Sequence, residues 1–430
     1  MIRRDAISEY SRGALWVLPT ICAVVAIAVG LSLSFVDVGP RSLLAFQGTA
    51  DDARTLLIGI SSTMVTVIAL LLGLAVVALQ LSSTQFSPRL LRNFLRDRPN
   101  QVVLGVFVGT FAYSAGGLFT VGISGGQRVD EFPRFAVSVA IALLFLSLAL
   151  LVFFADHLVH SIQVDAIMRV VERNTLPLVR AAEFSSEEPT PEPPAWAARV
   201  PSSVSGYLQR VDVSRLAAEA AQHGFAVRLR PRIGEHVVAG TTFAWVWRPT
   251  AGDTPPDVAR LGRQALYRYT RLGFERTLEQ DPSFGLRQLV DMACKALSPA
   301  VNDPYTAVQA IERLSVLYAE LATRPVGDCV VRDPRGAVVA VVAGRRFAEH
   351  LALGCGLIRR YGAREPTVAY ALLRMLTTCA ELAGDRPGRR AAIDREARLI
   401  VDAAERDTVE PADLAWIRRQ IETLGQVGAA

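Results

Sequence analysis

Residues 58–81, IGISSTMVTVIALLLGLAVVALQL, decide the architecture of this chain, because they contain no charged side chain. A helix rises 1.5 Å per residue, so a stretch of this length can cross a hydrocarbon core of roughly 30 Å. Near its start the stretch also carries the hydroxyl residues Ser61, Ser62, Thr63 and Thr66. We therefore expect a membrane-spanning helix with polar groups on part of its surface.

Three further uncharged runs lie in the first third of the chain. They are residues 14–36, 102–123 and 135–155. The third span, over residues 102–123, contains the G-x-x-x-G pair Gly105 and Gly109, which permits close contact between helices. Buried helices of a soluble protein are the alternative, but four such runs in succession are typical of membrane proteins. We expect an α-helical membrane domain over residues 1–160 with four transmembrane helices.

Arginines indicate the side of the membrane on which each loop lies. They are frequent before the first span, between the second and third spans, and after the fourth span. The two opposite loops hold fewer arginines and also carry Asp37, Asp51, Asp52 and Asp130. Under the positive-inside rule the arginine-rich side is cytoplasmic. Both termini, and the whole chain after about His157, are therefore expected in the cytoplasm.

The chain after the spans divides by composition. Residues 161–203 are expected to continue the fourth helix and then to form a proline-rich linker. Residues 204–250 contain the strand-like stretches FAVRLR and TTFAWVW. The segment IGEHVVAGTTFAWV resembles the hairpin of barrel-sandwich modules that carry biotin or lipoate, but no lysine stands at its tip. We expect a small barrel-sandwich-like β-module at residues 204–250 without a covalent carrier function.

Helical patterns dominate residues 251–430. Ala307, Ile311, Leu314, Tyr318 and Leu321 recur at spacings of four and three, which is typical of an apolar stripe on one helix. A β-hairpin is expected near residues 329–342, where two β-branched runs flank the turn sequence DPRG. The expected fold is therefore a four-helix membrane domain followed by a cytoplasmic α+β, mainly helical domain.

Several classes of function lack their sequence signatures. The five cysteines form no C-x-x-C pair, so neither a disulfide framework nor a zinc finger is expected. No Walker A loop, G-x-S-x-G, H-E-x-x-H or G-x-G-x-x-G motif that follows a strand occurs. The net charge of +5 is modest, and the arginines form no basic face interleaved with aromatic residues. We expect no enzyme activity, no cofactor and no nucleic-acid partner.

The second span runs into a polar segment, QLSSTQFSPRLLRNFLRDRP, at residues 80–99. Pro88 disfavours helix before it, and arginines follow at spacings of three and four. One interpretation is an interfacial elbow whose arginines contact anionic lipid headgroups, with the hydroxyls of the span packing against other helices. The other interpretation is a pore whose cytoplasmic mouth or gate lies here. The candidate pore or gate residues are Ser62, Thr66, Gln80, Thr84, Gln85, Ser87 and Arg89.

Two more polar clusters are candidates for binding. His157 and His160 share a helix face at the end of the fourth span and are weak candidates for a metal site, since two ligands do not complete four-coordinate geometry. The candidate ligand-binding residues in the segment ALSPAVNDPYTA are Lys295, Ser298, Asn302 and Asp303. The structural interpretation of that segment is a Ser-Pro helix stop followed by an Asn or Asp cap on the next helix.

Four motifs, in order along the chain, carry a resemblance to a known family. They are QFSPRLLRNFLRD, LGVFVGTFAY, HLVHSIQV and FGLRQLVDMACKALSPAVNDPYTA. Over nearly its whole length the chain resembles a bacterial family of predicted four-span inner-membrane proteins that is catalogued as a domain of unknown function. The resemblance implies a multi-pass protein of the bacterial cytoplasmic membrane, and it supplies no reaction and no catalytic residue.

Two functions of different classes follow. The first is a homo-oligomeric, channel-like or transport-like protein in contact with membrane lipids, whose cytoplasmic domain assembles or gates it. The uncharged spans argue against a proton pump with a mid-membrane carboxylate but allow a pore with hydroxyl ligands or a hydrophobic constriction. The second is a non-conducting scaffold or sensor whose cytoplasmic domain binds a protein or a small ligand of undefined identity.

Overall fold

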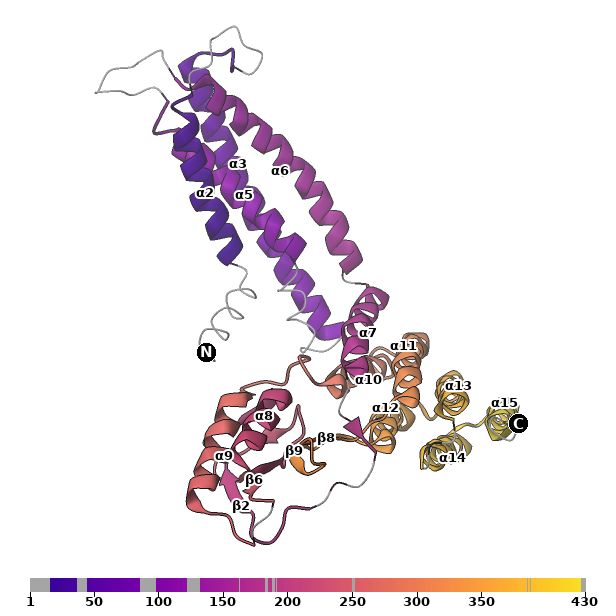
Figure 1. The fold of residues 1–430 in the computed structure, drawn as a ribbon. Helices are drawn as coiled ribbons and strands as arrows, with labels where there is room; N and C mark the ends of the chain where they lie inside the picture. The colour runs from indigo at the N-terminus through magenta and orange to yellow at the C-terminus, as the bar shows by residue number, and fades with distance from the viewer. Residues whose placement is uncertain are drawn as a thin grey trace. The chain divides into compact units, whose positions relative to one another are not determined.

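The structure is a computed structural model, and it describes residues 16–36, 45–85, 98–121, 132–161, 163–181, 185–187, 190, 192–249, 252–384, 386 and 388–426. The chain divides into two compact units, Met1–Ala166 and Ile167–Ala430. The first unit consists of long helices, and the second combines strands with helices (Figure 1). Helix α7 (Val164–Arg180) begins at the boundary and belongs almost entirely to the second unit.

Four long helices make up the part of the first unit that the structure describes. They are α2 (Val17–Leu33), α3 (Ala50–Gln85), α5 (Arg98–Gly117) and α6 (Arg134–Ser161). They lie side by side as a bundle (Figure 1). Two of them are long and apolar enough to cross a membrane, α3 over Ala50–Val77 and α6 over Arg134–Leu158.

The other two helices differ from the four full spans that the sequence predicts. α2 is apolar but only 17 residues long. α5 begins with Arg98, Pro99, Asn100 and Gln101 and ends at Gly117, so the run expected to span from 102 to 123 is helical over only part of its length. Among the described residues, the structure therefore provides two membrane-capable helices rather than four.

α5 lies at the centre of the bundle, because it contacts α2, α3 and α6. Its glycines permit the contact with α2. A Cβ atom on Gly105 would lie 2.9 Å from Sγ of Cys22, and one on Gly109 would lie 3.5 Å from the carbonyl oxygen of Cys22. The G-x-x-x-G pair therefore forms a helix interface within the chain, where absent side chains let two backbones approach. Between α5 and α6, Thr110 Oγ1 lies 3.0 Å from Ser147 Oγ.

Two sheets form the β-part of the second unit. Their strand orders are β1-β8-β9-β4-β6-β2 and β5-β3-β7. The strands are β1 (Ser185–Ser186), β2 (Ala198–Pro201), β3 (Gly206–Val211), β4 (Ala226–Leu229), β5 (His236–Val237), β6 (Thr242–Trp247), β7 (Thr270–Gly273), β8 (Asp328–Arg332) and β9 (Val338–Val342). The larger sheet is mixed, since β4 and β9 pair in parallel and its other pairs are antiparallel.

The β-module expected at residues 204–250 is not self-contained, and its barrel-sandwich hairpin does not form. β5 pairs with β3, whereas the two edges of β6 are occupied by β2 and β4. The reason lies in Gly234 and Gly240, which have φ angles of +86° and +81° and turn the chain on both sides of β5 toward the smaller sheet. The larger sheet is completed by β8 and β9, which form the antiparallel hairpin expected near residues 329–342.

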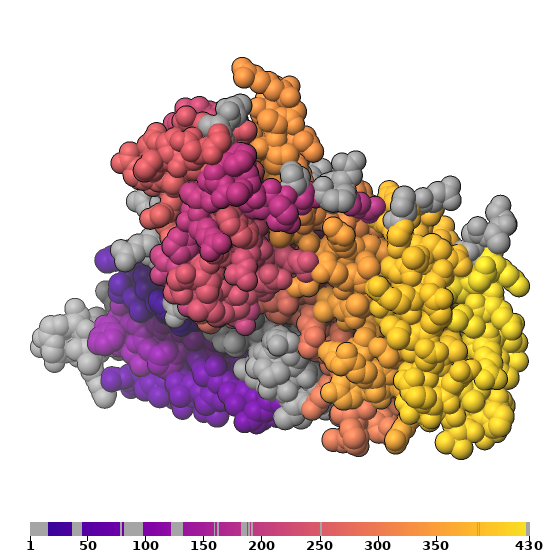
Figure 2. All heavy atoms as spheres, turned by 90° about the horizontal axis from the view of Figure 1, so that it is seen from below, coloured from indigo at the N-terminus to yellow at the C-terminus, as the bar shows by residue number. Residues whose placement is uncertain are grey.

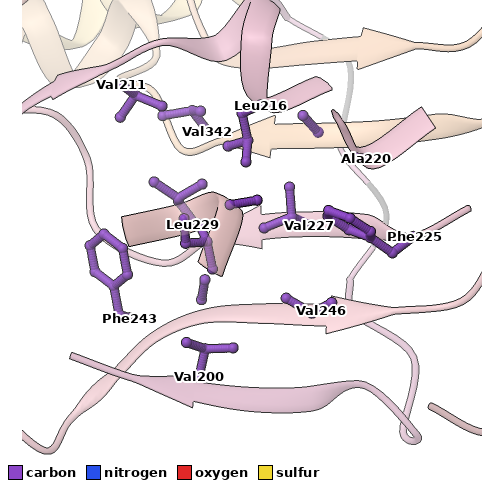
Figure 3. Packing of buried hydrophobic residues seen from close by; sticks show 14 of the residues in the cluster. Val200, Val211, Leu216, Ala220, Phe225, Val227, Leu229, Phe243, Val246 and Val342 are labelled. Carbon is purple, nitrogen blue, oxygen red and sulfur yellow. The ribbon is translucent and has the colours of Figure 1, made fainter. Parts of the chain in front are cut away.

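Helices α8 (Val213–His223) and α9 (Pro256–Tyr269) pack against the larger sheet. Asp212 begins α8 by accepting a hydrogen bond from N–H of Arg215, and Gly224 ends it in the left-handed conformation. The resulting core places Leu216 of α8 beside Val227 and Val342 of the sheet (Figure 3). This core holds the β-part of the unit together.

The rest of the second unit is helical. Its helices are α10 (Pro282–Ala296), α11 (Pro304–Thr323), α12 (Phe347–Gly362), α13 (Pro366–Ala383), α14 (Arg389–Asp407) and α15 (Pro411–Gln426). The orange and yellow atoms of α11 to α15 form one continuous mass in Figure 2. Asp281 and Asp303 cap α10 and α11, and a proline follows each cap. All five residues of the expected apolar stripe on α11 are buried.

Replacing Gly105 by leucine is expected to destabilise the first unit, because the new side chain must displace Cys22 of α2. Overpacking of this kind costs about 1–3 kcal/mol. A lower thermal unfolding midpoint of the full chain in detergent would measure it. The matched control is Gly116→Leu on the same helix, where nothing lies within 4 Å of the added Cβ atom. Equal midpoints for the two variants would contradict the α2–α5 contact.

Candidate functional site

The hydroxyl residues expected to line a pore lie on an exposed face of α3. Ser62 and Thr66 are about one turn apart, and Gln80 follows Ser62 after five turns of 3.6 residues. All three side chains are exposed. Gly59 and Gly73 lie on the same face, and nothing lies within 4 Å of a Cβ atom placed on either. We call Gly59, Ser62, Thr66, Gly73 and Gln80 the α3 hydroxyl face, which remains exposed in the single chain.

The hydroxyl groups on this part of α3 are bonded to the helix itself. Thr66 Oγ1 donates to the carbonyl oxygen of Ser62 at 3.2 Å, and Thr63 Oγ1 donates to that of Gly59 at 2.8 Å. A back-bonded hydroxyl has its donor satisfied and keeps an oxygen that can accept another hydrogen bond. The face can therefore lie against lipid, against another helix or along water.

The remaining gate candidates extend past the described side chains. Thr84 and Gln85 form the last residues of α3, and the positions of their side chains lie outside the described part of the chain. Ser87 and Arg89 lie wholly outside the described residues. The structure therefore places Ser62, Thr66 and Gln80 together and leaves the rest of the predicted gate as a prediction.

The histidines at the end of α6 have local contacts. The ring of His157 stacks on Phe153 with centroids 5.7 Å apart, and Nδ1 of His160 lies 2.8 Å from the carbonyl oxygen of Asp156. Within the described ranges, no group of three or more His, Cys, Asp or Glu residues could hold a metal ion. The structure thus brings no third ligand to His157 and His160 from the residues that it describes.

Ser298, Asn302 and Asp303 lie in one turn between α10 and α11, which we call the α10–α11 knuckle (residues 297–303), and Lys295 lies in the last turn of α10. Ser298 Oγ donates to the carbonyl oxygen of Lys295 at 2.7 Å. N–H of Asn302 donates to the carbonyl oxygen of Ser298, and Asn302 has a φ angle of 50°. Asp303 accepts from N–H and Oγ1 of Thr306, which lowers the pKa of its carboxyl. Ser298 and Asp303 therefore act in the turn itself, as the structural interpretation requires.

A groove of about 460 Å³ runs along α11. Its lining residues come from α7, α11 and α13 and are Leu176, Arg180, Ser315, Val316, Ala319, Glu320, Thr323, Thr378 and Leu382. At one end Glu320 bonds to both Arg180 and Arg324, which hold the pKa of its carboxyl below its usual value. We call this feature the α11 groove. Sequence patterns gave no sign of it, because its walls come from three helices distant in the chain.

Arg389 is a buried arginine that sequence reasoning missed. Its guanidinium donates to the carbonyl oxygens of Leu321, Ala322 and Arg324 at the end of α11, and it pairs with Glu187. A cation at a helix C-terminus satisfies otherwise unpaired carbonyls and interacts favourably with the helix dipole. Arg389 therefore fixes the end of α11 and ties the linker to it. One arginine among many carries no sequence signal of this role.

His350 is a buried ionisable residue of the second unit. Its side chain lies near the start of α12, 3% exposed, and Nδ1 has no hydrogen-bond partner among the described residues. Burial, followed by the positive charge of Arg345, lowers the pKa of His350 to about 4. The imidazole is therefore neutral at physiological pH.

Comparison with known proteins agrees with the membrane character of the chain. The profile of a family described as "Predicted membrane protein (DUF2254)" matches residues 12–378. Uncharacterized proteins of Mycobacterium tuberculosis and Mycobacterium bovis are 45% identical over 426 residues, covering 96% of this chain and 81% of theirs. No solved structure matches the chain.

Acidification is expected to weaken the second unit through His350. Because the folded pKa of about 4 lies below the ordinary 6.5, the unfolded chain binds the extra proton first, and stability falls as pH drops from about 6.5 to 4. The largest loss is about 3 kcal/mol, at 1.36 kcal/mol per pKa unit. Thermal midpoints measured across this range should fall less steeply for His350→Gln. His223→Gln replaces an exposed histidine and should show the same slope of thermal midpoint against pH as the native chain. Equal slopes for the two variants would refute the assignment of the acid sensitivity to His350.

Proposed function

The chain belongs to the family of predicted membrane proteins designated DUF2254, and from this premise we propose that it is a homo-oligomeric, channel-like protein of the bacterial inner membrane. Four segments cross the bilayer, with α2 and α5 as the two shorter spans beside α3 and α6. The arginine-rich loops lie on the cytoplasmic side, which places both termini there. The second unit is then a cytoplasmic domain that assembles or gates the membrane part.

The observation that carries this proposal is the α3 hydroxyl face. In the single chain, Ser62, Thr66 and Gln80 point away from the helices that bury Leu57, Ile60 and Met64 on the other side of α3. Glycine and hydroxyl residues on one face favour close helix association in membranes. When several copies place this face around an axis, the hydroxyl and amide oxygens line a path that ions can follow.

The proposal needs no catalytic residue and no cofactor. The polar groups on α3 are hydroxyls and an amide, which are ligands for partly dehydrated ions and are not acids or bases. The partners are membrane lipids and further copies of the chain, and no nucleic acid is required.

Replacing Ser62 and Thr66 together by leucine is expected to lower ion flux into liposomes reconstituted with the full chain, by roughly tenfold or more, because the path loses its polar ligands. Tracer uptake of several monovalent cations and anions measures this, alongside the oligomeric state in detergent. Val65→Leu, also an exposed residue of α3 at 53% exposure, is the matched control and should conduct as the native chain does. Liposomes that stay tight to every ion, or a monomer in detergent, would count against the channel.

A second candidate, a non-conducting scaffold or sensor, is favoured by the α11 groove. Its volume of about 460 Å³ lies in the range of small-molecule sites, roughly 300–1,000 Å³, and its apolar floor ends at charged side chains. A sensor would retain a ligand or a protein here and show no flux. Native mass spectrometry of the full chain should then detect bound mass that is lost in Val316→Glu. Bound mass unchanged in that variant would exclude the groove as its site.

A further inference from the structure

Two ion pairs between α7 and α11 show which end of α11 lies beside the start of α7. Glu172 pairs with Arg313 at 3.3 Å, and Arg180 pairs with Glu320 at 3.2 Å. Residue numbers rise together in both pairs, so α7 and α11 run parallel. Counting eight residues back from the Glu172–Arg313 pair, about 12 Å along each helix, reaches Val164 and Tyr305. The start of α11 is therefore level with the start of α7.

The packing of α10 agrees with this result, because α10 leads through the knuckle into α11 and so ends where α11 starts. A Cβ atom on Gly285 would overlap Oγ1 of Thr175, so α7 and α10 are in close contact at this point. Eleven residues, about 16 Å, separate Gly285 from Ala296 at the end of α10. The same number separates Thr175 from Val164. The α10–α11 knuckle thus lies at the end of the second unit where α7 begins.

The turn between α12 and α13 lies at this end as well. A Cβ atom on Gly362, the last residue of α12, would lie 3.1 Å from Cδ1 of Leu297 in the knuckle. Arg374 of α13 bonds to Glu312 at 2.7 Å, and Arg386, just after α13, donates to the carbonyl oxygen of Thr323 at the end of α11, so α13 runs parallel to α11. Counting eight residues back from each partner reaches Pro366 and Pro304, the first residues of the two helices. The two turns therefore form one surface, which we call the α7-start surface.

Apolar and aromatic side chains are exposed on the α7-start surface. Val301 at the tip of the knuckle is 46% exposed, Tyr305 is 72% exposed, and Tyr361 in the last turn of α12 is 60% exposed. The hydrogen bonds of Ser298 and Asp303 hold the knuckle so that Val301 stays at its tip. An exposed valine and two exposed tyrosines therefore lie on adjoining turns of this surface.

Cations accompany these residues. Arg360 and Arg364 flank Tyr361 and are exposed, and Lys295 lies in the last turn of α10 before the knuckle. Asp303 at this end is engaged with Thr306 and caps α11. Tyrosine, aliphatic and basic side chains together are the composition that binds the interface of an anionic bilayer.

We propose that the α7-start surface docks on the cytoplasmic surface of the lipid bilayer. The inference rests on the proposed topology, in which α6 crosses the membrane toward the cytoplasm. α6 ends at Ser161 and α7 begins at Val164, so only a short stretch of sequence separates the proposed membrane exit from α7. Val301, Tyr305 and Tyr361 enter the headgroup region, and Lys295, Arg360 and Arg364 bind lipid phosphates.

Photolabelling of the full chain in lipid nanodiscs tests this proposal. The discs contain phosphatidylglycerol and a trace of a phospholipid with a photoreactive group near its headgroup. Residues 296–313 and 361–364 each form one tryptic peptide and should carry the label. The peptide of residues 272–276, which contains Phe274 at 88% exposure before the start of α10, is the internal control and should be labelled several-fold less.

Variants of the chain provide a second test of the docking proposal. Replacing Val301 by glutamate together with Tyr305 by serine should lower labelling of residues 296–313 several-fold, because the apolar contact is lost. Val238→Glu, at a valine 53% exposed between β5 and β6, should leave it unchanged. Lys295 is the sole lysine of the chain, so its acylation by a water-soluble reagent gives a single-site readout that should be slower in nanodiscs than in detergent.

The possible outcomes distinguish failure of the docking proposal from failure of the proposed topology. Label on α6 but not on residues 296–313 and 361–364 would overturn the docking surface and leave the topology standing. No label on α6 would refute the topology, and the inference with it. Docking would also be overturned if residues 272–276 were labelled equally, or if labelling were unchanged in the Val301 and Tyr305 variant. It would likewise be overturned if a co-purifying protein, in place of lipid, were cross-linked at residues 296–313. Ion flux enters none of these readouts.

Discussion

Hydrocarbon offers no hydrogen-bond partners, and this constraint governs the first unit. Long helices satisfy their own backbone groups, and Ser61 and Thr63 return their hydroxyl donors to carbonyls one turn earlier. The polar pair Thr110 and Ser147 closes on itself between α5 and α6. Once polar groups are paired in this way, contacts between the helices depend on shape, which is why Gly105 and Gly109 decide where α2 can lie.

In the second unit, charged groups stabilise the ends of helices. Buried guanidinium groups are found where carbonyl oxygens are concentrated, as for Arg389 at the end of α11. At the other end of α11, Asp303 supplies a carboxylate to the first N–H groups. Both ends of α11 are thus matched to the sign of the helix dipole. This helix is a fixed axis beside which α7 and α13 are aligned.

The sequence was sufficient for features that depend on neighbouring residues. Two β-branched runs and turn chemistry predicted the hairpin of β8 and β9, and aspartate followed by proline predicted the cap of α11. The sequence was insufficient to predict which strands pair when a strand has several possible partners. β5 joins the smaller sheet because of the turns at Gly234 and Gly240, and β4 takes β9 as its parallel neighbour from far along the chain. Local spacing contains no information on such pairings.

The candidate sites show the same difference between features that depend on neighbouring residues and features that depend on distant ones. Helical periodicity was enough to place Ser62, Thr66 and Gln80 on one face of α3, and the local sequence was enough to place Ser298 and Asp303 in one turn. The α11 groove and the surroundings of His350 and Arg389 depend on helices that meet only in the folded unit. Residues that act through distant partners are therefore absent from the sequence-based set.

The charge of the α7-start surface comes from side chains rather than from helix ends. α7, α11 and α13 begin there and contribute partial positive charge, whereas α10 and α12 end there and contribute partial negative charge. A hydrogen bond from Thr408 to the carbonyl oxygen of Ala363 brings the end of α14 to the same turn, so the opposing dipoles are nearly balanced. Attraction to an anionic bilayer must then arise from Lys295, Arg360 and Arg364. Because such attraction is screened beyond about 10 Å at 0.1 M salt, the proposed docking requires these three side chains to come within about that distance of the lipid phosphates.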